Sequence, residues 1–136
     1  MQPHSIRTFL LVPTLSIALT CCITPAATAQ NASGVWRGRW HAQATATRPA
    51  HGGTLNARLK QIGPGVYRGT FYGRFAVIVP YVYRTRVYQC GSQLWASRKI
   101  GFGKSYTMRL NLSGNRMHGG WSTGSARGTI FLRRTR

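Results

Sequence analysis

Residues 66–75 read VYRGTFYGRF, and the alternation in this stretch decides the fold. Tyr67, Gly69, Phe71, Gly73 and Phe75 share one face of an extended strand, because successive side chains of a strand point to opposite sides. The other face is mostly polar and carries two arginines. Large and small residues that alternate on an inward face fill the tapered interior of a small barrel. The stretch therefore predicts a barrel strand.

Similar short stretches with a period of two recur through residues 34–136, separated by turn signals about every 8–12 residues. The cluster at 62–65 (IGPG) predicts a hairpin turn, and Pro80 predicts an edge, a bulge or a corner because proline cannot donate to a sheet. We therefore predict an all-β fold, a single small antiparallel up-and-down barrel of about eight strands. The aromatic content favours a filled interior over a hollow one. The candidates for this core, or for a ligand cavity, are Trp36, Trp40, Tyr67, Phe71, Phe75 and Trp121.

Residues 1–29 match a signal peptide. A weakly basic start precedes an apolar stretch over 9–23, and Ala27-Thr28-Ala29 supplies the small residues that a signal peptidase reads, so we expect cleavage before Gln30. Two adjacent cysteines in the apolar stretch leave lipoprotein processing open as an alternative. Residues 30–33 are expected to form a short linker, and no later segment reaches the ~18 apolar residues of a membrane-spanning helix.

Cys90 is the one cysteine that remains after this cleavage. The mature chain would then have no internal disulfide. Free cysteine is among the most buried residue types, so we expect Cys90 to be buried in a monomer, with a Cys90-linked dimer as the alternative.

The chain contains 19 Lys and Arg but no Asp and no Glu, for a formal net charge of +19. Carboxylate acid–base pairs, carboxylate metal sites and acidic triad members are excluded. We expect the exterior to contact an anionic polymer or surface: acidic or sulfated polysaccharide, anionic lipid or extracellular nucleic acid, with no specific DNA site. Alternatively, the basicity reflects a general preference for arginine in the proteins of the source organism. The predicted outward, anion-binding residues are Arg37, Arg39, Arg58, Lys60, Arg68, Arg74, Arg84, Arg86, Arg109 and Arg133.

The histidines, serines and tyrosines of the chain do not indicate a metal site, a catalytic site or a ligand platform. The histidines after residue 29 lack the spacing of metal ligands, and no serine lies in a Gly-x-Ser-x-Gly elbow, so we expect no metal, no cofactor and no enzymatic activity. Tyr81, Tyr83 and Tyr88 near Arg84 and Arg86 would suit a stacking platform. We interpret these tyrosines instead as ordinary core or strand neighbours.

Several short motifs occur in a suggestive order: Gly34-Val35-Trp36, His51-Gly52-Gly53, Gly73-Arg74-Phe75, Val79–Tyr83 and Arg127–Leu132. Their order resembles a group of small exported proteins of planctomycete-type bacteria that has no characterised function. The resemblance implies an eight-stranded barrel-like fold and a location in the bacterial envelope. Together with the predicted export, we therefore expect a periplasmic, cell-surface or extracellular protein. The resemblance implies no activity and no site residue. The Gly-x-Trp opening and the closing arginine strand also resemble lipocalin- and avidin-type barrels, in architecture alone.

These observations predict an exported, non-enzymatic, Arg-rich barrel that associates with an anionic polymer or surface. The alternative is a lipocalin-like carrier of a small apolar or aromatic ligand, and an inhibitor that presents its loops is a third class. A pocket lined by aromatic residues and open at one end would favour the carrier. A filled barrel would favour the surface binder.

Overall fold

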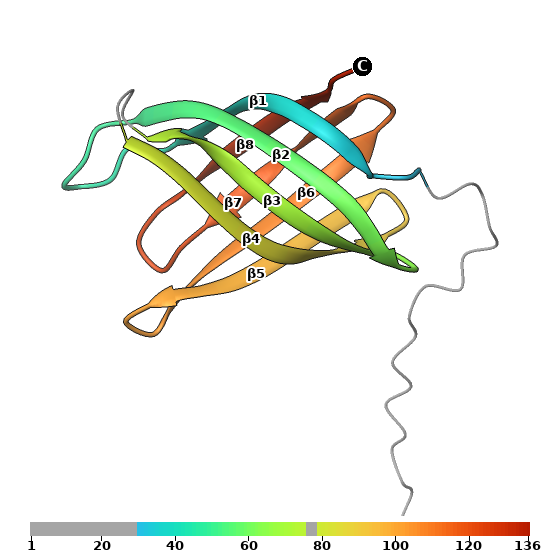
Figure 1. Cartoon of the computed structure of the whole chain (residues 1–136). Helices are drawn as coiled ribbons and strands as arrows, with labels where there is room; N and C mark the ends of the chain where they lie inside the picture. Colours follow the sequence, from blue (N-terminus) through green and yellow to red (C-terminus); the bar gives the residue numbers. More distant parts are fainter. Residues whose placement is uncertain (1–29, 76–78) are drawn as a thin grey trace, which may run out of the picture.

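The alternating stretches form eight antiparallel strands in the computed structural model, which describes residues 30–75 and 79–136 (Figure 1). Each strand pairs with the next in the chain, and the last pairs with the first, so the sheet closes into the predicted up-and-down barrel. The predicted signal peptide and the side chain of Phe75 lie outside the described part of the chain. The strands are β1 (Gly34–Ala42), β2 (His51–Gly63), β3 (Val66–Phe75), β4 (Val79–Cys90), β5 (Gln93–Gly101), β6 (Lys104–Ser113), β7 (Arg116–Ser122) and β8 (Arg127–Arg134).

The register places large inward side chains opposite small ones. Leu55 of β2 lies opposite Gly38 of β1, and Ala57 lies between Trp36 of β1 and Phe71 of β3. Leu55, Ala57, Trp36 and Phe71 are all buried. This complementarity fixes the register, because a slip by one residue would move every inward side chain to the outside.

Two inward glycines let neighbouring strands approach closely. A Cβ atom at Gly38 would meet the carbonyl oxygen of Phe131, and one at Gly119 would meet the carbonyl oxygen of Arg109. A side chain at either position would force the two backbones apart. These glycines therefore permit the tight curvature that a small barrel needs.

One end of the barrel is closed by the segment that precedes β1. The Trp36 indole Nε1 donates a hydrogen bond of 3.0 Å to the carbonyl oxygen of Ala32, and both residues are completely buried. The Arg134 guanidinium lies 4.5 Å from the centroid of the Trp36 ring. It also donates to the carbonyl oxygens of Ser33 (2.7 Å) and Asn31 (2.6 Å). The expected linker thus lies across the barrel and closes this end.

Toward the other end, β4 and β5 separate (Figure 1). Their ladder covers the three pairs from Tyr88 to Cys90 on β4, whereas β3 and β4 pair along their whole described length. Across the gap, the Arg98 guanidinium donates a 3.0 Å hydrogen bond to the Arg84 carbonyl oxygen. Pro80 lies in the part of β4 that pairs with β3 alone, which confirms the predicted edge position.

Cys90 is exposed, so the predicted burial is wrong. It ends β4 immediately before the turn at Gly91, which has a φ of 59°. The alternation along β4 points Val87 and Gln89 inward and leaves Cys90 on the outer face. Within the described residues, no helix is long and apolar enough to cross a membrane.

Candidate functional site: an aromatic cup at the open end

A cavity of about 540 Å³ occupies the open end of the barrel, and we call it the cup. Its lining comes from several strands and from the loops at this end. The predicted filled interior is therefore wrong for this half of the barrel, because the inward aromatic rings pack against one another along the wall and leave the axis open. The lining residues are Trp40, Gln43, Thr45, Thr47, Arg48, His51, Leu55, Tyr81, Tyr83, Lys104, Tyr106, Trp121, Thr123, Ser125 and Ala126.

The wall of the cup is a continuous series of rings, which we call the aromatic belt. Its rings belong, in order around the wall, to His51, Trp40, Trp121, Tyr106, Tyr83 and Tyr81. Neighbouring centroids in this series lie 5.5, 6.0, 5.9, 5.7 and 6.5 Å apart. Such edge-to-face and offset contacts are the arrangements that aromatic pairs prefer. The buried Phe71 ring stacks on Tyr83 at 4.9 Å and connects the belt to the core.

The tyrosine hydroxyls of the belt stay protonated. Burial, with the neighbouring Tyr106, raises the pKa of Tyr81 to about 12. Burial also raises the pKa of Tyr83 and of Tyr106 above the ordinary value. Tyr81 donates to the Thr54 carbonyl oxygen at 3.3 Å, whereas the buried Tyr83 hydroxyl forms no well-aligned hydrogen bond among the described residues, although Tyr106 lies close to it. The hydroxyls of Tyr83 and Tyr106 can therefore serve as neutral hydrogen-bond donors to a ligand.

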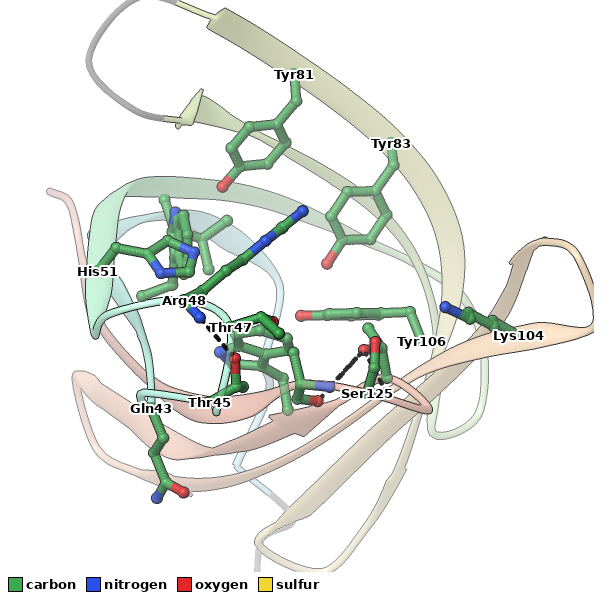
Figure 2. A pocket seen from close by; sticks show the side chains of 15 residues that line it. Gln43, Thr45, Thr47, Arg48, His51, Tyr81, Tyr83, Lys104, Tyr106 and Ser125 are labelled. Carbon is green, nitrogen blue, oxygen red and sulfur yellow. Dashed lines mark hydrogen bonds between the residues drawn. The ribbon is translucent and has the colours of Figure 1, made fainter.

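Two cationic residues accompany the belt. Arg48, on the β1–β2 loop, extends into the cup between Tyr81 and Tyr83, and Lys104, at the start of β6, lies beside Tyr106 (Figure 2). No lining residue carries a negative charge. The cup therefore combines an aromatic wall with a positive electrostatic potential.

The structure divides the predicted core and cavity residues into two groups. Trp40 and Trp121 line the cup. Trp36, Tyr67 and Phe71 are buried in the core cluster instead. The Tyr67 hydroxyl is part of the closed end, where it accepts from the Ala32 amide and donates to the Gln89 side chain.

Sequence reasoning missed much of the cup. Tyr81 and Tyr83 were interpreted as ordinary neighbours along a strand, although their alternation with Val87 places all three on the inward face. Tyr106 is not among the candidate site residues that the sequence indicates. The alternation could have grouped these tyrosines, but no pattern in the sequence indicates that Arg48 of the loop turns inward.

The predicted anion-binding residues are all exposed. The register aligns some of them into cross-strand rows without any intervening acid. One row is Lys60, Arg68 and Arg86 on β2, β3 and β4. Directly opposite like charges are destabilising in a sheet unless another charge compensates them. A second row, on β1, β8 and β7, consists of Arg37, Arg133 and Arg116.

A second aromatic contact lies on the exterior. Tyr88 and Trp95 point outward and stack with centroids 4.6 Å apart. Trp95 is half-exposed, and it lies opposite Arg109 in the ladder between β5 and β6. Tyr88 is therefore the one member of the considered tyrosine platform that faces outward beside the cationic rows, since Tyr81 and Tyr83 line the cup.

Neither sequence comparison nor the geometry of the described residues assigns a family or a metal site. Among the described residues, no group of three or more His, Cys, Asp or Glu lies close enough to hold a metal ion. No protein-family model and no curated protein matches the chain. The small barrel is compatible with a non-enzymatic binding protein.

Proposed function

We propose that this protein is an exported, non-enzymatic barrel that binds a small planar aromatic molecule in the cup. The observation that carries this proposal is the aromatic belt around a cavity of about 540 Å³. Ligand pockets are usually concavities of ~300–1,000 Å³ with a mostly apolar lining and a few polar groups. The belt favours a planar ring system over a flexible chain, because its ring faces and edges offer stacked and edge-to-face contacts.

The composition supports binding without chemistry. The chain has no Asp or Glu that could act as a general base or orient a histidine. Of the described residues that line the cup, His51 alone carries an imidazole, and its Nδ1 lies 3.1 Å from the carbonyl oxygen of Pro49. Export rests on the signal-peptide pattern over residues 1–29. Intact mass of the protein recovered from outside the cytoplasm should correspond to a chain that begins at Gln30.

A fluorescent probe tests the binding function. N-phenyl-1-naphthylamine is neutral, is built from aromatic rings and emits strongly in apolar surroundings. We expect one probe per barrel, in a saturable titration. The double variant Tyr106→Leu/Trp121→Leu removes two stacked belt rings, whose centroids lie 5.9 Å apart, and should weaken binding about tenfold or more, because each aromatic pair contributes roughly 0.5–1.5 kcal/mol beyond its buried area.

The exterior ring pair offers a matched control. The double variant Tyr88→Leu/Trp95→Leu also removes one stacked pair, with centroids 4.6 Å apart, but on the outer face. This variant should bind the probe like the wild type. Equal losses in the two double variants, or no saturable binding to the wild type, would contradict binding in the cup.

A second candidate function is supported by the cationic rows. In this alternative the exterior associates with an anionic polymer, whose charges would relieve the repulsion within the row of Lys60, Arg68 and Arg86. Binding to duplex DNA or heparin should then fall steeply with salt, with a log–log slope on DNA of about −0.9 for each phosphate contacted.

A double variant tests this exterior surface. Arg68→Gln/Arg86→Gln should reduce the salt slope on DNA by about two, because each cation that contacts a phosphate contributes about one. Arg48→Gln/Lys104→Gln removes the same charge from the cup and serves as the control. Flow-through of the wild type at about 0.15 M salt on both polymers would contradict the surface function.

A further inference from the structure

We propose that the ligand of the cup is an anion, an aromatic molecule with a carboxylate, sulfonate or phosphate group that pairs with Arg48. This inference rests on the proposed aromatic-ligand function and specifies its ligand class. The starting observation is the local structure of the β1–β2 loop. Thr45 and Arg48 form an isolated antiparallel bridge, with amide-to-carbonyl bonds of 2.8 and 3.4 Å, and the Arg48 amide also donates to Thr45 Oγ1 at 3.2 Å. This turn fixes the backbone from which the Arg48 side chain enters the cup.

The Arg48 guanidinium reaches polar and aromatic groups but no negative charge. Figure 2 shows it extended between the rings of Tyr81 and Tyr83. Among the described residues it donates no side-chain hydrogen bond, and the cation–π contact of the described chain belongs to Arg134 and Trp36 at the closed end. Within the described part of the chain, the Arg48 guanidinium is therefore held neither by a hydrogen bond nor by a cation–π contact.

Arg48 is exposed in the structure, and a ligand that fills the cup to this lining residue would exclude water from the guanidinium. Removing a charge from water is costly unless an opposite charge or several hydrogen bonds compensate it. The chain contains no Asp or Glu, and its terminal carboxylate follows Arg134, at the closed end. The compensating charge therefore has to come from the ligand. Guanidinium binds carboxylate, sulfonate or phosphate oxygens through two parallel hydrogen bonds, which gives orientation as well as affinity.

The remaining polar groups suit the same ligand. The hydroxyls of Tyr83 and Tyr106 stay protonated and can donate to anionic oxygens. The Tyr83 hydroxyl is buried beside the Tyr106 hydroxyl, with which it interacts, and it has no other polar partner among the described residues. Lys104 adds a second positive charge beside Tyr106. The belt would hold the rings of the ligand while Arg48 and these donors hold its acidic group.

Two probes that share one ring skeleton separate the charge from the rings. 8-Anilinonaphthalene-1-sulfonate carries a sulfonate on the skeleton of N-phenyl-1-naphthylamine. We expect the wild type to bind the sulfonate at least about tenfold more tightly than the neutral probe at about 0.15 M salt, as a charge-assisted pair implies. Arg48→Gln should abolish this preference and leave the affinity for the neutral probe within about twofold.

Arg116→Gln is the matched control, because Arg116 is exposed at the start of β7 and its loss lowers the net charge equally. It should preserve the sulfonate preference. If Arg116→Gln lowers sulfonate affinity as much as Arg48→Gln, the attraction comes from net charge and the role of Arg48 is overturned. If the wild type binds both probes equally, the anion inference fails while the aromatic-ligand function stands. If neither probe binds, both proposals fail together.

Discussion

At the closed end of the barrel, Trp36 and Arg134 contact each other and hydrogen-bond to the chain around them, whereas at the open end the Arg48 guanidinium has no comparable ring or carbonyl partner among the described residues. The Arg134 guanidinium has an aromatic face and two carbonyl acceptors. The Arg48 guanidinium reaches into a cavity among rings and donates no side-chain hydrogen bond among the described residues. Arginine and tryptophan therefore pack together to close one end of the barrel, whereas at the other end they line a cavity. Geometry, not residue type, distinguishes them.

The largest expected effect is on the free energy of unfolding, and it should differ between tryptophan variants at the two ends. Trp36→Ala should destabilise the fold by about 3–5 kcal/mol, because it leaves a large cavity in a packed interior. Trp121→Ala should cost less, about 2 kcal/mol, because Trp121 is only partly buried and borders the cup, so that its loss removes two ring contacts and one hydrogen bond but opens no cavity in a closed core. Urea unfolding followed by circular dichroism measures both free energies. Equal losses would mean that the open end is packed as tightly as the closed end.

A smaller difference in the free energy of unfolding is expected between variants of Arg134 and Arg48. Arg134→Gln should lower the free energy of unfolding by about 2 kcal/mol, because it removes charge-assisted hydrogen bonds to two backbone carbonyls. Arg48→Gln should change the free energy of unfolding by less than about 0.5 kcal/mol, as surface substitutions usually do. A large loss in Arg48→Gln would make Arg48 a structural brace and would remove the contrast between the ends.

The fold could be predicted because the binary pattern alone specifies it. The alternation over 66–75 places Tyr67, Phe71 and two glycines inside, and the structure confirms this for every residue of the stretch whose side chain is described. The turn at 62–65 and the edge position of Pro80 follow from local backbone chemistry. Such features depend on neighbours in sequence, so they are visible without coordinates.

The cup could not be predicted to the same extent, because it depends on contacts between distant strands. The alternation along a strand could not show that the rings of Tyr83 and Tyr106 meet across the gap where β4 and β5 separate. The direction of Arg48 depends on a loop turn that has no periodic pattern. Cys90 shows the same limit at the other end, since a preference for burial could not reveal that this cysteine faces outward beside a turn.

Alkaline pH should act mainly on the open end. An unfolded tyrosine loses its proton near pH 10, whereas burial holds the pKa of Tyr81 at about 12 and raises that of Tyr83 and Tyr106. Above pH ~10 the unfolded state therefore binds fewer protons than the folded state, so the free energy of unfolding falls as pH rises. We expect Tm to decline from pH ~10, and Tyr83→Phe/Tyr106→Phe to decline less steeply. Identical slopes would contradict the burial of these hydroxyls.

The smallest expected effect is the response to acid, which should not distinguish the two ends. Acid unfolding mostly reflects protonation of carboxylates that are paired in the native state, and this chain has no Asp or Glu at either end. Arg134 binds carbonyl oxygens, which do not titrate. Histidine in general gains charge on acidification, which adds some repulsion in a chain that already carries a formal charge of +19. At fixed ionic strength we therefore expect Tm to fall only slightly between pH 6 and pH 3, measured by circular dichroism. A steep collapse over this range would show that another titrating group, at one of the two ends, stabilises the barrel.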